Sequence, residues 1–91
     1  METRITTARA LGKGTLELTF EGEGTFAVDL QSLIARGNLY AKLADPAFLG
    51  DMQLMYEGLF IQWPDDFDVS ARTLWEMAQE QRSGARKRKI S

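Results

Sequence analysis

The stretch TLELTFEGEGTFAV, residues 15–28, decides the fold class of this chain. Apolar residues alternate with polar ones from Leu16 to Phe20, which is the period-2 pattern of a strand with one buried face. Gly22 and Gly24 can supply the positive φ that tight hairpin turns need, and the alternation resumes after them. The stretch therefore predicts two antiparallel strands joined by a glycine turn.

Similar patterns lie on both sides of this hairpin. Residues 5–11 are mostly small, β-branched or apolar and end at the glycine turn 12–14, so they predict a further strand of the same meander. Downstream, residues 52–55 and 59–63 predict a second hairpin. That hairpin is expected to stop at Pro64, because proline has no N–H to donate to a ladder.

Two short helical segments are predicted between the hairpins. Asp29 can accept hydrogen bonds from the free amides of a first turn, and Gly37 suits the left-handed exit of that helix. Asp45 followed by Pro46, with Gly50 four residues later, has the order of cap, first helical position and helix end. We therefore expect one helix after Asp29 and a single helical turn after Asp45.

The last third of the chain predicts a longer amphipathic helix. Ser70 is a favourable N-cap, and the apolar positions that follow it recur at the spacing of one helix face. These positions are Ala71, Leu74, Trp75 and Ala78. The helix is expected to end between Gln81 and Ser83. The predicted fold class is α+β: a three-stranded antiparallel meander, a short helix, a second hairpin and a C-terminal amphipathic helix.

Charge divides the chain into a body and a tail. The 91 residues are 44% hydrophobic and 26% charged, close to the averages for folded domains, and predict one core. Residues 1–81 carry all 13 acidic residues and a net charge of −7, whereas residues 82–91 carry a charge of +5. Such a run of charge buries too little apolar surface to offset its ordering entropy. We therefore predict a single domain over residues 1–81 and a disordered basic tail over 82–91.

The residue types in the chain argue against several kinds of chemistry. The sequence contains no cysteine and no histidine. Disulfides, thiolate metal sites and nucleophiles activated by histidine are thereby excluded. We predict a protein that is not an enzyme and that has no cofactor and no metal site. No apolar run approaches the length of a membrane span, and the first ten residues lack the apolar stretch of a signal peptide, so we expect no membrane association and a cytoplasmic location.

Three aspartates near the second hairpin allow two interpretations. Asp65, Asp66 and Asp68 could offer carboxylate oxygens to Mg²⁺ or Ca²⁺. They lack the spacing and the terminal glutamate of an EF-hand loop. The structural interpretation, which we favour, is a turn followed by acidic residues that complement the dipole of the next helix.

Four aromatic residues are candidates for a partner-binding surface. They are Phe60, Trp63, Phe67 and Trp75, and Tyr56, in the predicted turn of the second hairpin, could line the same pocket. Aromatic residues at a strand end or on a helix stripe are more often part of the core. Phe60 is the most informative, because Ile61 and Trp63 claim the opposite face of the same strand. A strand that is apolar on both faces can be covered by a partner chain on one of them.

The basic tail supplies a second set of candidates, for nucleic acid or for an acidic partner. Its cationic residues are Arg82, Arg86, Lys87, Arg88 and Lys89. Each could add a salt-dependent contact to a phosphate, or the tail could simply keep the protein soluble. The charge of −7 on the body argues against nucleic acid, because it repels the same polyanion.

Four short motifs, in order, resemble the bacterial family called domain of unknown function 2442. They are Phe26-Ala27-Val28-Asp29-Leu30, Leu43-Ala44-Asp45-Pro46-Ala47-Phe48, Ile61-Gln62-Trp63-Pro64, and Asp68-Val69-Ser70 continuing to Leu74. The resemblance covers roughly residues 5–80 and implies a small α+β sheet domain. It also implies an antitoxin-like role, as suggested for some members, and it transfers no catalytic residue. This chain has Asp65-Asp66 where the family has Asn-Gly, a position that predicts a positive φ.

The sequence leads to two hypotheses for function. The first is a non-catalytic protein-interaction module, antitoxin-like or an adaptor, whose partner is another small protein or a second copy of the chain. The alternative is a nucleic-acid-binding regulator that uses the basic tail. The first is favoured by the missing catalytic residue types, the strand around Phe60 and the family resemblance.

Overall fold

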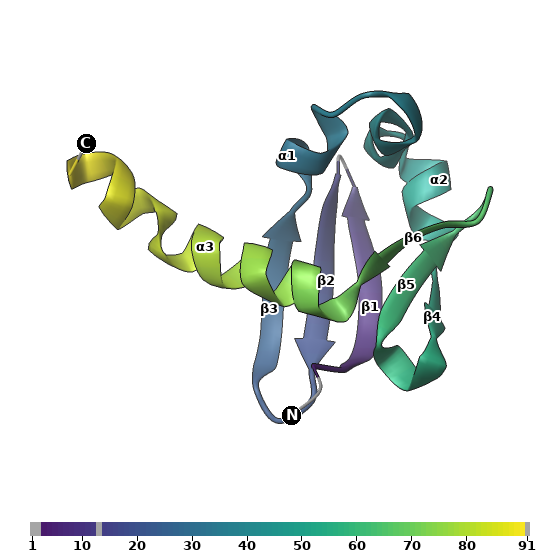
Figure 1. Cartoon of the computed structure of the whole chain (residues 1–91), viewed down its shortest axis with the longest axis horizontal. Coiled ribbons are helices and arrows are strands. Elements are labelled where there is room, and N and C mark those ends of the chain that lie inside the picture. The colour runs from purple at the N-terminus through teal and green to yellow at the C-terminus, as the bar shows by residue number, and fades with distance from the viewer. Residues whose placement is uncertain (1–2, 13, 91) are drawn as a thin grey trace.

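The N-terminal third forms a three-stranded antiparallel meander, here called sheet A (Figure 1). The computed structural model describes the backbone of residues 3–12 and 14–90, and side chains up to Arg82. The strands, in the order β1-β2-β3, are β1 (Ile5–Gly12), β2 (Thr15–Phe20) and β3 (Gly24–Asp29). The predicted meander is therefore confirmed, with strand ends that differ by one residue at most.

Apolar and polar residues alternate along β2, so the apolar side chains lie on one face of the sheet and the polar ones on the other. Leu16, Leu18 and Phe20 are at most 1% exposed, and Leu16 is paired with Val28 across the sheet. The turn between β2 and β3 has Gly22 at φ 78° and Gly24 at φ 104°. Glycine reaches these angles without the steric cost that a side chain would bring, so the turn is relaxed.

Three short helices follow sheet A and lie together at one end of the sheets in Figure 1. They are α1 (Gln31–Ile34), the 3-10 helix η1 (Asn38–Ala44) and α2 (Pro46–Gly50). The Asp29 carboxylate accepts a hydrogen bond from the Gln31 N–H at 2.9 Å, and the Asp45 carboxylate accepts one from the Ala47 N–H at 3.0 Å. Both predicted helices are confirmed, whereas η1 was not predicted.

A second three-stranded antiparallel sheet, here called sheet B, has the order β4-β5-β6. Its strands are β4 (Gln53–Met55), β5 (Phe60–Trp63) and β6 (Phe67–Ser70), and the 3-10 turn η2 (Tyr56–Gly58) joins the first two. The predicted second hairpin is confirmed. Strand β6 corrects the prediction that the chain passes directly from a turn into the last helix.

The chain ends in helix α3 (Ala71–Ile90). The Ser70 hydroxyl accepts a hydrogen bond from the Thr73 N–H at 3.1 Å, as expected of an N-cap. The backbone continues as helix to Ile90, so the predicted end between Gln81 and Ser83 is wrong. The side chains of residues 83–90 and all of Ser91 lie outside the described residues, and a disordered basic tail stays a prediction.

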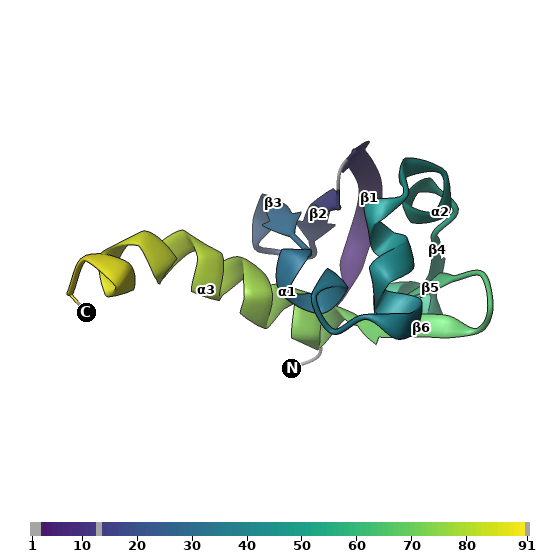
Figure 2. The same cartoon turned by 90° about the horizontal axis from the view of Figure 1, so that it is seen from above.

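Helix α3 packs across the inner face of sheet A and then runs on past β3 (Figures 1 and 2). The Trp75 ring meets Phe20 and Phe26 edge-on, with ring centroids 5.1 and 5.4 Å apart. Farther along, the Gln81 amide donates to the Asp29 carbonyl at 2.7 Å and accepts from the Asp29 N–H at 2.9 Å. One side chain thus satisfies both backbone groups of Asp29 at the outer edge of sheet A.

The core joins both sheets and the helices. Its buried side chains are Ile5, Leu16, Leu18, Phe20, Val28, Leu30, Leu33, Leu43, Leu49, Ile61, Trp63, Phe67, Val69, Ala71, Leu74, Met77 and Ala78. Sheet B meets β1 closely at Gly58, where a Cβ atom would overlap the backbone carbonyl of Ile5. A glycine is therefore required at this contact. Among the described residues, none of the helices has the length and hydropathy of a membrane crossing.

Candidate partner-binding surface

Two of the predicted partner-binding residues belong to the core. Trp63 is 2% exposed and Phe67 is 7% exposed, with their ring centroids 5.5 Å apart. The Trp63 indole N–H donates to the Leu49 carbonyl at 3.0 Å and so links sheet B to α2. The core interpretation of Trp63 and Phe67 therefore holds in the structure, whereas a contact of either residue with a partner stays a prediction.

Trp75 and Arg82 lie on the helix that covers sheet A. Trp75 is half-buried by the contacts with Phe20 and Phe26 described above. The Arg82 guanidinium lies 5.4 Å from the centroid of the Phe26 ring, within the range of a cation–π contact. The other basic candidates are Arg86, Lys87, Arg88 and Lys89, and their side chains lie outside the described residues.

Phe60 lies on the opposite face of sheet B from the core. Burial alternates along β5, so that Ile61 and Trp63 are buried while Phe60 is only half-buried. Phe60 is paired with Met55 on one side and with Ser70 on the other. Strand β5 is therefore apolar on both faces at this position, as the sequence predicted.

Tyr56 extends the apolar area beyond Phe60. Its ring meets the Phe60 ring edge-on at 5.7 Å, and 68% of the residue is exposed, the most of any large hydrophobic residue in the described part of the chain. The sequence predicts that Tyr56 lies in the hairpin turn and could line the same pocket as Phe60, but it does not place Tyr56 among the four main candidates. A signal was available, because three residues with large apolar side chains, Met55, Tyr56 and Phe60, lie within six positions around one tight turn.

We define the sheet B face as the outward side chains of this sheet together with Tyr56. Two rows follow from the strand register: Met55, Phe60 and Ser70 form one, and Gln53, Gln62 and Asp68 form the next. All six are half-buried or exposed. The face therefore changes from apolar at the Tyr56 end to polar and acidic at the other end.

The polar end of the face opens into a hollow of about 190 Å³. Its lining residues are Asp51, Gln53, Gln62, Trp63, Pro64, Asp65 and Asp66. The Lys42 ammonium contacts the Asp65 carboxylate at 2.9 Å. Within the described part of the chain, Asp51, Asp66 and Asp68 form no ion pair.

The described residues contain no group of three or more acidic side chains placed to hold a metal ion. The aspartates at 65 and 66 form a turn before β6, and Asp68 lies within β6 itself. The turn at residues 65 and 66 is confirmed, but the prediction that these acidic residues complement the dipole of the next helix is wrong, because β6 intervenes and the first turn of α3 contains no acidic residue.

Backbone strain is concentrated in the turns at the two ends of the sheet B face. Tyr56 and Glu57 adopt φ of 53° and 57°, and Asp65 and Asp66 adopt 71° and 58°. The positive φ predicted for the Asp65-Asp66 turn is thus confirmed. Residues other than glycine in this region cost roughly 1–3 kcal/mol each, and such costs cluster at functional sites.

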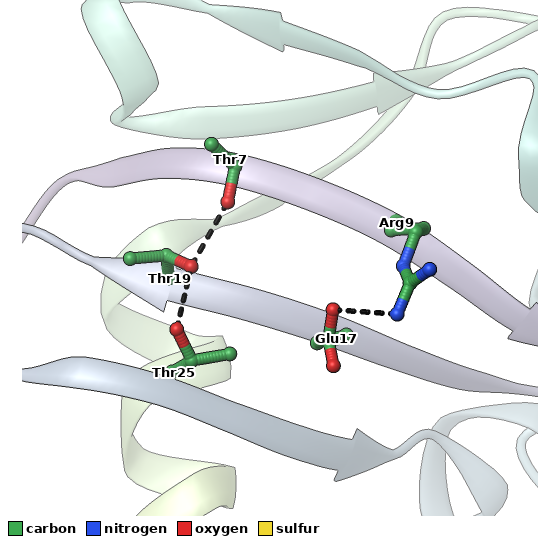
Figure 3. Close-up of polar contacts among 5 residues, drawn as sticks. All are labelled: Thr7, Arg9, Glu17, Thr19 and Thr25. Carbon is green, nitrogen blue, oxygen red and sulfur yellow. Dashed lines mark hydrogen bonds and ion pairs between the residues drawn. The ribbon is translucent and has the colours of Figure 1, made fainter.

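The outer face of sheet A has a different character, shown in Figure 3. The Thr7 hydroxyl donates to the Thr19 hydroxyl at 2.9 Å, and the Thr19 and Thr25 hydroxyls are 2.8 Å apart. In the next row, Arg9 forms an ion pair with Glu17 at 2.9 Å. These polar side chains bond to one another and are exposed to water. A ligand would therefore gain little free energy by replacing these bonds.

Comparisons with protein-family models, curated proteins and solved structures find no match. The resemblance to domain of unknown function 2442 therefore stays a prediction that rests on the four motifs.

Proposed function

We propose that this chain is a non-catalytic protein-interaction module that binds a partner protein through the sheet B face. The observation that carries the proposal is Tyr56, an exposed aromatic residue held at positive φ beside the half-buried Phe60. The positive φ of Tyr56 costs conformational free energy, and the turn that bears this cost exposes the tyrosine ring to solvent. Such a cost is understandable where the side chain meets a partner.

The composition of the face suits protein binding. Tyrosine and phenylalanine bring large contact areas at low entropic cost, and aromatic residues are enriched among the residues that dominate binding energy. Removing the exposed part of Tyr56 from water would contribute roughly 2 kcal/mol. The polar row around Gln53 and Gln62 would supply the hydrogen-bonding rim that surrounds such a centre.

The biological role that we propose is that of an adaptor or an antitoxin-like protein in the bacterial cytoplasm. The resemblance to domain of unknown function 2442 supports this role, as does the absence of histidine and cysteine, which removes the usual catalytic nucleophiles and bases. The partner would be another small protein or a second copy of this chain.

The test is photo-crosslinking from single positions in living cells. A photoreactive phenylalanine analogue at position 56 should give one discrete crosslinked protein band. The matched control is the same analogue at Leu39, which is 41% exposed and lies on η1. If position 56 gives no band, or gives the same diffuse pattern as position 39, the proposal is wrong.

The rival function is nucleic-acid binding through the basic segment. It is favoured by the course of α3, which carries residues 82–90 away from the acidic body (Figure 2). Binding to duplex DNA should then weaken steeply with salt, because each phosphate contact releases a counterion. A full-length variant with Arg86, Lys87, Arg88 and Lys89 changed to glutamine should lose that binding. If the wild-type chain does not bind DNA at low salt, this function is excluded.

A further inference from the structure

We infer that the occupant of the sheet B face is the basic C-terminal segment of a second copy of this chain, which would give head-to-tail association. This inference rests on the proposed function, since it names the partner of the same face. It is carried by charge complementarity, by the opposite positions of the two surfaces on the molecule, and by their matching lengths.

The charges of the two surfaces are complementary. Residues 82–91 carry five positive charges and no negative one. Asp68 on the sheet B face, and Asp51 and Asp66 in the adjoining hollow, form no ion pair among the described residues. Lys42 is the only described cation that contacts a carboxylate of the hollow. A cationic segment would therefore meet acidic groups whose charge the chain itself does not neutralise.

The two surfaces lie at opposite ends of one molecule. In both views, sheet B lies at one end and the C-terminal part of α3 points away from it (Figures 1 and 2). The contacts of Trp75 with sheet A and of Gln81 with Asp29 hold α3 in this direction. As a continuation of this helix, residues 82–90 lead away from the sheet B face of their own chain, so the face that they would meet belongs to another copy.

The lengths and the apolar ends also agree. As helix, residues 82–90 extend about 13 Å, at roughly 1.5 Å per residue. The four residues of β5 span about 13 Å, at roughly 3.3 Å per residue. The segment ends in Ile90, its only large apolar residue, and the sheet B face ends in Tyr56 and Phe60. If the basic residues of the segment contact the aspartates, Ile90 at its end would therefore contact the aromatic pair Tyr56 and Phe60.

The expected symmetry follows from this pairing. The contact joins two different surfaces, so each added copy leaves one free basic segment and one free sheet B face. Heterologous contacts of this kind build open chains or closed rings rather than a simple twofold dimer. The acidic body argues for this occupant over nucleic acid, because the same aspartates that attract the segment would repel a phosphate backbone.

The experiment is sedimentation velocity on the full-length chain at low and high salt. Wild-type protein should associate at about 50 mM salt and return to monomer at about 1 M, where the screening length is roughly 3 Å. One variant reverses the segment (Arg86, Lys87, Arg88 and Lys89 to glutamate). A second reverses the face (Asp51→Lys with Asp68→Lys), at two exposed positions with ordinary φ. Each variant alone should associate at least about tenfold more weakly.

The most decisive sample in this experiment is a mixture of the two charge-reversed variants. Each contact in the mixture again joins opposite charges, so association should return. The matched control is Glu21→Lys with Glu23→Lys, an equal charge change in the exposed turn of sheet A. It should leave wild-type association unchanged. Equal weakening by this control would show an effect of net charge alone and would overturn the inference.

The failure of this inference can be told from the failure of the proposed function. A wild-type chain that stays monomeric at low salt overturns head-to-tail association. If position 56 still crosslinks to a different protein, the sheet B face remains a partner-binding surface. If position 56 crosslinks to nothing, the proposed function fails as well.

Discussion

Sheet A and sheet B are both three-stranded antiparallel meanders, yet they differ in the residues that make their turns. The turn between β2 and β3 reaches positive φ at glycines. The turns of sheet B reach it at Tyr56, Glu57, Asp65 and Asp66, with Gly58 the only glycine among them. Sheet A is thus built from locally favourable pieces, whereas sheet B depends on the rest of the fold to hold strained turns. The difference supports our proposal that the binding surface lies on sheet B and not on sheet A.

The largest effect is expected at the contact between the two sheets. Gly58→Ala places a Cβ atom against the Ile5 carbonyl at φ 93°, and the rigid backbone must shift to admit it. We expect a loss of more than about 3 kcal/mol in the free energy of unfolding, measured by chemical denaturation. Gly22→Ala is the control, because its φ of 78° is similar but no atom lies within 4 Å of the added Cβ. Equal losses would contradict the account of this contact.

The two tryptophans differ in burial, because Trp63 lies in the core at the end of β5 whereas Trp75 on α3 covers sheet A and is half-buried. Trp63→Phe removes ring volume from the core and leaves the Leu49 carbonyl without its donor, so we expect a loss of about 2–3 kcal/mol. Trp75→Phe changes a half-buried ring that keeps its contacts with Phe20 and Phe26, and should cost less than about 1 kcal/mol. Urea titration of both variants measures the contrast, and a reversed order would refute it.

Relief of strain should stabilise sheet B. Asp66→Gly removes a side chain from a residue at φ 58°, and we expect a gain of up to about 1 kcal/mol in the free energy of unfolding. Asp68→Gly, two residues later in β6, should instead lose about 1 kcal/mol, since glycine weakens an extended strand. We therefore predict that the two substitutions change the free energy of unfolding with opposite signs, as measured by thermal and urea unfolding. A loss at both positions would mean that the Asp66 turn is not strained.

The smallest effect is expected on the outer face of sheet A. Thr19→Val keeps the β-branched shape but removes the hydroxyl that joins Thr7 and Thr25 (Figure 3). Since these groups are exposed to water, the loss should be about 0.5 kcal/mol or less. Thr15→Val on the same strand serves as the control. A loss above about 2 kcal/mol at Thr19 would show that this face contributes far more to stability than a scaffold surface should.

The sequence predicted sheet A better than sheet B for a physical reason. In β2 the alternation runs over six residues and is bounded by glycines, so local pattern and final structure agree. Strand β6 has only four residues and follows a proline and two aspartates, a composition that favours a turn leading into a helix. Its strand character comes from pairing with β5, and a single sequence gives little indication of such non-local pairing. The end of α3 was placed too early, because Gly84 and the charge run favour a stop.

The candidate surface was predicted in part. The apolar character of both faces of β5 follows from the alternation around Phe60, which the structure confirms. The burial of Trp63 and Phe67 could not be assigned from aromatic character alone, because it depends on β6 and α2 folding over them. The sequence places Tyr56 in a turn near Phe60, but it does not predict the positive φ of Tyr56, because a tyrosine in a short turn carries no local signal for that angle.

The central claim is that this molecule uses the sheet B face, and not the outer face of sheet A, to bind. The most direct measurement is the change in backbone amide NMR shifts of the full-length chain as its concentration is raised at low salt. We predict shifts over β4, β5, the Tyr56 turn and the basic end of α3, with β1 to β3 unchanged. Shifts confined to the rows of Thr7 and Arg9 on sheet A would contradict the claim.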